Sequence, residues 1–220
     1  MNTLRVKRSG IEKQQTSSRQ ARTIKPLTII LLGDPAAGKA TQAEFLAKHY
    51  HLYDFDMGKQ LTVVRQKDAK ISAVLKRNYD QGKITPSYIA QKILRDTINK
   101  VPKSTGILFD GHPKMLVEAK VAIKELKKNE RSEPIVIYLT IPVEETVKRM
   151  HKRKGYSDGK FGKRSDDTKE ALRNRAKYYR VNIAAVIKYF STRYPYKKIS
   201  GLGSVAQVRQ RVFKALNDLI

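Results

Sequence analysis

Two glycines and a lysine in one short stretch have the spacing of a phosphate-binding loop. Gly33 and Gly38 bracket four residues, and Lys39 follows directly. Glycine at tight backbone positions lets N–H groups turn toward a polyphosphate, and the lysine supplies a mobile charge for its β and γ oxygens. A hydroxyl near the helix start binds Mg²⁺ in such loops, and here Thr41 supplies it because Ala40 intervenes. The pattern predicts a nucleoside triphosphate site, and the alternative interpretation is a glycine turn with a solvated lysine.

Other candidate residues lie far along the chain. Asp110 ends an apolar run, and ligands bind at the carboxyl edge of open α/β sheets. We therefore expect it to hold Mg²⁺ through water, with a turn-capping carboxylate as the alternative. Arg149 and Arg153 are four residues apart, so they share one face of a predicted helix. The alternative is that two basic residues in so basic a chain carry no function.

These residues must be positioned by alternating strands and helices. Continuous apolar runs, typical of strands buried on both faces, occupy residues 28–32, 106–109 and 134–141, with a shorter one at 196–199. Helix patterns separate them: one begins at Thr85–Pro86, one runs from about Asp167 to about Tyr194, and one runs from about Ser204 to Leu219. This alternation predicts a parallel α/β sheet.

The charge balance is unusual. Lys and Arg number 46 against 20 Asp and Glu, a net charge of +26. Such a field attracts nucleotides, nucleic acid or an acidic membrane face, and the alternative is a lysine-rich solvated surface. Cysteine is absent, which excludes disulfides and thiolate metal sites. No apolar run approaches the roughly 18–20 residues of a membrane span, so we expect a cytoplasmic protein without a membrane partner.

Residues 1–25 differ from the rest of the chain. They hold seven Lys and Arg residues against Glu12 alone, among Ser, Gln and Thr. A segment this polar cannot bury enough surface to offset its ordering entropy, so we predict a basic disordered tail that contacts nucleic acid non-specifically. The alternative is a mitochondrial transit peptide. The remaining residues, 26–220, are predicted to form one domain.

The loop GDPAAGKATQ resembles that of the adenylate kinase and wider nucleoside monophosphate kinase family. Further segments match in order and spacing: residues 81–86, 109–114, 149–153, 163–167, Arg175 and 200–205. The resemblance covers about residues 27–219. It implies a three-layer P-loop α/β fold, with a mostly parallel five-stranded sheet flanked by helices. It also implies a helical monophosphate-binding insert at about 56–86 and a short lid at about 153–165.

The resemblance implies an ATP-dependent phosphotransferase. The family's reaction moves the γ-phosphoryl group of ATP, with Mg²⁺, to AMP and gives two ADP, and we expect a monomer. Such a transfer is mostly positioning and charge neutralisation, so it needs cations but neither a nucleophilic side chain nor a general base. The alternatives are a kinase for CMP, UMP or dAMP, or a degenerate nucleotide-binding fold associated with RNA or the ribosome.

The resemblance also implies roles for individual residues. The catalytic cations would be Lys39, Lys114, Arg153, Arg164 and Arg175. ATP would contact Pro35, Ala36, Ala37, Gly38, Lys39, Ala40, Thr41, Arg149, Arg153 and Gly203. The monophosphate would contact Met57, Thr62, Lys83, Ile84, Thr85, Gly111, His112, Pro113, Lys114, Glu118, Arg164 and Arg175. Mg²⁺ would be held by Thr41 and, through water, by Asp110.

Departures from the family pattern lie mainly on the monophosphate side. Thr62 stands where the family has its acceptor-phosphate arginine, and Lys59 or Arg65 would have to substitute. Lys114 replaces a second arginine, which keeps the charge but loses the bidentate fork.

Two more departures concern base recognition and the loop itself. Glu118 stands where adenylate kinases have Gln, and an ionised Glu can only accept hydrogen bonds. It suits the amino group of adenine or cytosine but opposes a bare ring nitrogen. Ala36 replaces a loop glycine, which is harmless at negative φ and costly at positive φ.

Overall fold

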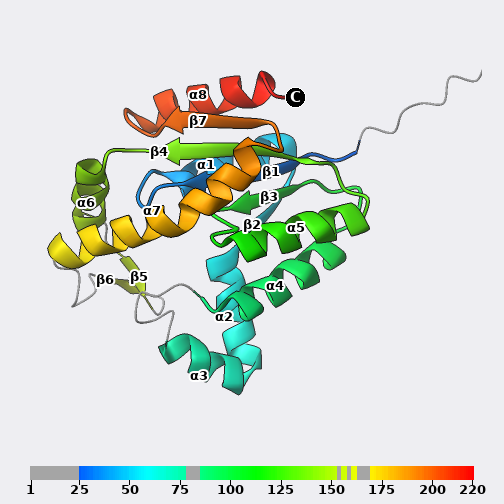
Figure 1. Cartoon of the computed structure of the whole chain (residues 1–220), viewed down its shortest axis with the longest axis horizontal. Coiled ribbons are helices and arrows are strands. Elements are labelled where there is room, and N and C mark those ends of the chain that lie inside the picture. The colour runs from blue at the N-terminus through cyan, green and yellow to red at the C-terminus, as the bar shows by residue number, and fades with distance from the viewer. Residues whose placement is uncertain (1–24, 78–84, 153–154, 158–159, 163–168) are drawn as a thin grey trace, which may run out of the picture.

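The computed structural model describes residues 25–77, 85–152, 155–157, 160–162 and 169–220 (Figure 1). Five parallel strands form its main sheet in the order β2-β3-β1-β4-β7. The strands are β1 (Thr28–Gly33), β2 (Tyr53–Asp56), β3 (Ile107–Asp110), β4 (Pro134–Thr140) and β7 (Tyr196–Ser200). The predicted parallel α/β fold, with the five strands implied by the family resemblance, is confirmed.

Helices cover both faces of this sheet (Figure 1). The helices of the described ranges are α1 (Lys39–Tyr50), α2 (Met57–Lys67), α3 (Ala69–Arg77), α4 (Ser87–Lys100), α5 (Leu116–Lys128), α6 (Val143–Lys152), α7 (Lys169–Ser191) and α8 (Val205–Asn217). A two-stranded antiparallel hairpin, β5 (Gly155–Ser157) with β6 (Lys160–Gly162), lies between α6 and α7 in the chain. None of the helices in these described ranges is long and apolar enough to cross a membrane.

The two faces of the sheet bury alternate residues of the same strand. Ile30 and Leu32 of β1 pack in the core with α4, α5 and α7, whereas Ile29 and Leu31 pack in the core with α1 and α8. All four side chains are fully buried. This two-sided burial is why the strand is a continuous apolar run and does not alternate with polar residues.

The apolar runs predicted four of the strands but not β2. Its sequence, Tyr53-Asp54-Phe55-Asp56, has one buried residue, Phe55, between two aspartates. An edge strand of this kind carries little hydrophobic signal, although it pairs with β3 along its whole length.

The helix starts agree with the sequence patterns to within a residue or two. The last helix, expected from about Ser204, begins at Val205, and Ser204 caps it by accepting from Gln207 N at 3.2 Å. The helix expected at Thr85–Pro86 begins one residue later, at Ser87, with no side-chain cap. Helix α7 ends at Ser191, before the expected Tyr194, because the chain then turns into β7.

Candidate active site

The phosphate loop joins the carboxyl end of β1 to α1. A Cβ on Gly33 would lie 2.6 Å from the carbonyl oxygen of Leu139, so only glycine fits beside β4. Gly38 has φ 91° and precedes the first residue of α1. Lys39 Nζ donates to the carbonyl oxygens of Gly33 at 2.8 Å and Asp34 at 3.1 Å. The loop is therefore wrapped around the lysine ammonium group, which is where a polyphosphate needs a positive charge.

Ala36 adopts the conformation that makes its departure costly. Its φ is 59°, in the left-handed region where a Cβ is disfavoured by about 1–2 kcal/mol. Positive φ at this position is what the family's glycine allows without strain. Thr41 is exposed in the first turn of α1, and its role in holding Mg²⁺ stays a prediction.

Asp34 is a site residue that the sequence reasoning missed. Its buried carboxylate accepts hydrogen bonds from Tyr138 Oη at 2.7 Å, Thr140 Oγ1 at 3.0 Å and Ile141 N at 3.0 Å. Arg180 of α7 completes the group, with Nη2 at 3.0 Å from Oδ2. Burial acts to raise the pKa of Asp34, but the donors together with Arg180 outweigh it and hold the pKa below its ordinary value. An ionised carboxylate thus ties the phosphate loop to β4 and α7.

Sequence alone held little signal for this group. Asp34 and Arg180 are 146 residues apart and belong to different kinds of element. An aspartate after a strand predicts a turn, and an arginine on a helix predicts a solvated face, so neither residue indicates the other.

Asp110 lies at the end of β3, beside the lysine. Burial raises its pKa to about 6; the charge of Lys39 opposes this shift, and Asp56 and Asp54 add to it. Gly111 follows with φ 65°, and a Cβ there would lie 3.2 Å from Lys39 Cε. The end of β3 therefore holds a carboxyl group whose charged form is stabilised by a nearby cation. Within the described ranges, no three His, Cys, Asp or Glu side chains form a metal cluster.

Glu118 is fully buried at the start of α5. Its Oε2 accepts from the backbone N–H groups of Lys114 at 3.0 Å and Met115 at 3.1 Å, and Oε1 accepts from Ser87 Oγ at 3.3 Å. His112 Nε2 lies 3.2 Å from Oε2. Burial acts to raise the pKa of Glu118, but His112 and the two backbone amides outweigh burial and hold the pKa below its ordinary value. The carboxylate caps α5, and its part in base reading stays a prediction.

Burial also shifts the pKa values of two basic neighbours of Glu118, His112 and Lys114. Desolvation lowers the pKa of His112, although Glu118 acts to raise it. Desolvation likewise lowers the pKa of Lys114, against the opposing charges of Glu118, Asp110 and Asp56. Pro113, between them, is buried. The segment predicted to face the monophosphate is thus packed against Glu118 and the carboxyl end of β3.

The other monophosphate residues begin α2. Asp56 caps this helix by accepting from Gly58 N at 2.7 Å, and Met57 is buried in the core. Thr62 Oγ1 donates to the carbonyl oxygen of Gly58 at 3.1 Å, so the hydroxyl at the family's arginine position bonds to its own helix. Lys59 forms an exposed 3.5 Å ion pair with Asp54.

Arg149 lies where α6 meets the phosphate loop. Its Nε is 2.7 Å from Glu145 Oε1, and Nη1 donates to the carbonyl oxygens of Gly201 at 3.1 Å and Ala36 at 3.5 Å. The turn at 201–203 includes Gly203 at φ 100°. The structure therefore brings together the two segments predicted to surround ATP, with Arg149 between them.

The remaining predicted residues are only partly visible. Pro35 and Ala40 lie in and just after the loop, Ala37 is buried there, and Thr85 is buried before α4. Lys83, Ile84, Arg153 and Arg164 lie outside the described residues, and Arg175 is described only as a backbone position in α7. The predicted arginine cluster therefore stays a prediction.

Comparison with known proteins agrees with this geometry. The adenylate kinase family model matches residues 31–194. An adenylate kinase of Azobacteroides pseudotrichonymphae is 30% identical over 193 residues, which cover 88% of this chain and 98% of that relative. One of Flavobacterium johnsoniae is 31% identical over 194 residues, covering 88% and 100%, and one of Mycolicibacterium vanbaalenii is 30% identical over 190 residues, covering 86% and 99%. With its phosphate loop, strand-end aspartate and five-stranded parallel sheet, the chain belongs to the adenylate kinase family.

Proposed function

We propose that this protein transfers the γ-phosphoryl group of ATP to AMP, reversibly, giving two ADP. A phosphate oxygen of AMP attacks the γ-phosphorus, the bond to the β–γ bridging oxygen breaks, and the electron pair leaves with ADP. No proton needs to move at neutral pH. The observation that carries the proposal is the loop wrapped around Lys39, with Asp110 at the neighbouring strand end.

The site's own residues supply charge and position. Lys39 places its ammonium group at the loop, and Arg149 spans the loop and the 201–203 turn. Both cations offset negative charge on the triphosphate, which is the main requirement of phosphoryl transfer. We propose that Arg153, Arg164, Arg175 and Lys114 complete the charge around the transferred group. The roles of the three arginines are supported by their match to the family pattern, and that of Lys114 by the charge it keeps at a family arginine position.

The residues present suit Mg²⁺. The Thr41 hydroxyl and the Asp110 carboxyl are hard oxygen donors near the loop. Burial, Asp56 and Asp54 raise the pKa of Asp110 to about 6, so a bound cation would favour its charged form. Mg²⁺, when bound, would neutralise charge on the β and γ oxygens.

The acceptor is the finer part of the proposal. AMP is favoured by the family, and CMP, UMP or dAMP are the alternatives. Glu118→Gln tests base reading: an AMP-specific change in KM would support a contact with the base. A matched loss of thermal stability with unchanged KM for every acceptor would assign Glu118 to helix capping alone.

The family assignment also supports a description of the whole molecule. We propose that residues 56–86 form the monophosphate-binding insert and 153–165 the lid. The helices α2 and α3 project from one end of the sheet, in keeping with an insert (Figure 1). We also propose a cytoplasmic monomer whose basic residues 1–25 contact nucleic acid non-specifically, in keeping with the net charge of +26.

A coupled assay with Mg·ATP and each monophosphate tests the proposal. We expect turnover with AMP, and a drop of at least about 100-fold in kcat/KM for Lys39→Ala. Lys48→Ala, an exposed lysine on the same helix, is the matched control and should retain activity. Absence of turnover with every acceptor, in protein that is folded by circular dichroism, would overturn the proposal.

A further inference from the structure

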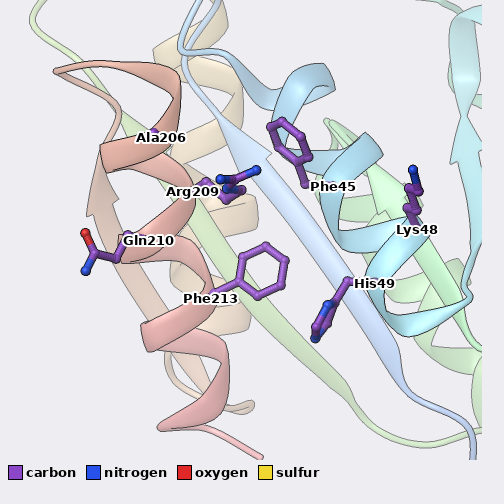
Figure 2. Close-up of a pocket in the computed structure, with 7 residues that line it drawn as sticks. All are labelled: Phe45, Lys48, His49, Ala206, Arg209, Gln210 and Phe213. Atoms are coloured by element: carbon purple, nitrogen blue, oxygen red, sulfur yellow. The ribbon is translucent and has the colours of Figure 1, made fainter.

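The helices α1 and α8 enclose a groove that the phosphotransfer reaction does not use. The helices are tied at both ends, where Gln42 Nε2 donates to the carbonyl oxygen of Val205 at 3.3 Å and Tyr50 Oη lies 3.1 Å from Asn217 Oδ1. Between these ties lies a groove of about 860 Å³ (Figure 2). It is lined by Phe45, Lys48 and His49 from α1 and by Ala206, Arg209, Gln210 and Phe213 from α8.

The groove combines aromatic rings with cations. Phe213 lies edge-on to His49, with ring centroids 5.0 Å apart, and the guanidinium of Arg209 covers the ring of Phe45 at 4.7 Å (Figure 2). Both phenylalanines are half-buried, so each ring is partly available from the solvent side. A guanidinium held over a ring keeps its N–H donors at the edge, where they can reach an anion.

The cations of this groove have no acidic partner in the part of the chain that the structure describes. Lys48 and Arg209 are exposed, and neither forms an ion pair there. By contrast, the exposed Lys92 is paired with Asp96 at 2.9 Å and Lys103 with Glu130 at 2.9 Å. Within the described residues, positive charge is thus left without an acidic partner beside half-buried aromatic rings.

We propose that this groove binds single-stranded RNA. Unpaired bases offer flat rings that stack on aromatic side chains and guanidinium groups, and the phosphates between them match Lys48 and Arg209. The net charge of +26 would draw a polyanion to the surface from a distance. An acidic peptide would match the cations but leave the rings unused, so RNA is the partner that satisfies both features. The basic segment 1–25 is itself excluded as an occupant by charge.

The test is fluorescence anisotropy of the full chain with a labelled oligouridylate about 12 nucleotides long. An oligouridylate carries no adenine, so it does not resemble the proposed substrates ATP and AMP. We expect salt-sensitive binding at about 0.1 M KCl. Lys48→Glu/Arg209→Glu should weaken binding at least about tenfold. It should also make the negative slope of log affinity against log salt shallower by about 1.4, the value for two lost phosphate contacts on a single strand.

Two controls separate this groove from general charge attraction. Lys120→Glu/Lys124→Glu reverses two exposed lysines on α5, across the sheet from the groove, and should change affinity by less than about threefold. Phe213→Leu keeps the charge and should weaken binding at least about fivefold if a base stacks on the ring. All variants should retain kinase activity, since none of these residues belongs to the proposed active site.

Three outcomes would overturn the proposal. These are no oligouridylate binding by the unaltered chain, equal weakening by the α1–α8 and α5 charge reversals, and groove-dependent binding of an acidic peptide or anionic vesicles in place of RNA. Kinase activity is read separately, so failure here leaves the proposed phosphotransfer standing.

Discussion

Among single residues, Asp110 lies in an environment that disfavours its charged form. Burial and two nearby aspartates raise its pKa to about 6, although Lys39 partly compensates. The folded state therefore binds a proton on Asp110 more tightly than the unfolded state, whose aspartate has an ordinary pKa near 3.8. This penalty on folding is absent below the unfolded pKa and complete above about pH 6.

Asp110→Asn should therefore stabilise the protein while harming catalysis. In urea unfolding at about pH 7.5 without nucleotide or Mg²⁺, we expect a gain of roughly 2–3 kcal/mol, which shrinks toward zero near pH 4. A gain of the same size at both pH values would show that the charge is not its cause. The variant should lose activity if Asp110 holds Mg²⁺ waters as proposed.

Ala36 gives a second prediction for a single residue. Ala36→Gly should raise the free energy of unfolding by about 0.5 kcal/mol or more, because relief of a left-handed alanine exceeds the added chain entropy of glycine. Ala37→Gly is the matched control: Ala37 is buried and is not among the residues of positive φ, so it should lose about 1 kcal/mol. Chemical denaturation measures both, and a loss of stability for Ala36→Gly would contradict the argument.

Between elements, the Asp34–Arg180 pair joins the phosphate loop to α7. Asp34 is buried whereas Arg180 keeps about a third of its side-chain exposure, so removal of the arginine leaves the aspartate charge without its cation. The bonds from Tyr138, Thr140 and the Ile141 amide remain, which limits the cost. The pair also fixes α7, the helix that carries Arg175, relative to the loop.

A double-mutant cycle measures this coupling. Arg180→Met should cost about 2–3 kcal/mol, and Asp34→Asn with Arg180→Met should cost less than the sum of the single changes by at least about 1 kcal/mol. Lys92→Met, which breaks the exposed pair with Asp96, should change stability by no more than about 0.5 kcal/mol. Additive effects in the cycle would show that the pair does not act as a unit.

Across the whole molecule, the net charge of +26 should oppose compaction. Salt screens this self-repulsion, so we expect the melting temperature to rise as KCl increases from about 0.05 to about 0.5 M. Lys120→Glu/Lys124→Glu lowers the net charge by four and should give a smaller rise. Calorimetry measures both, and a melting temperature that falls with KCl would mean that surface ion pairs outweigh the repulsion.

The sequence by itself determined the architecture and the nucleotide-facing edge. Continuous apolar runs predicted four strands because strands buried on both faces have no polar side, and the glycine spacing of 33–38 predicted a turn that only such residues allow. The apolar runs did not predict β2, because Phe55 is its only buried residue. These are local properties, and local patterns predict them.

The tertiary structure decided which side chains share an environment. Asp34 and Arg180 come into contact through the packing of α7 on β4. The buried Glu118 carboxylate accepts hydrogen bonds from the backbone amides of the two residues that precede α5. The groove between α1 and α8 exists only because β1 and β7 bring these distant helices to one face. Hydrogen-bond partners, burial and charge compensation depend on contacts between residues far apart in the chain, so local patterns could not supply them.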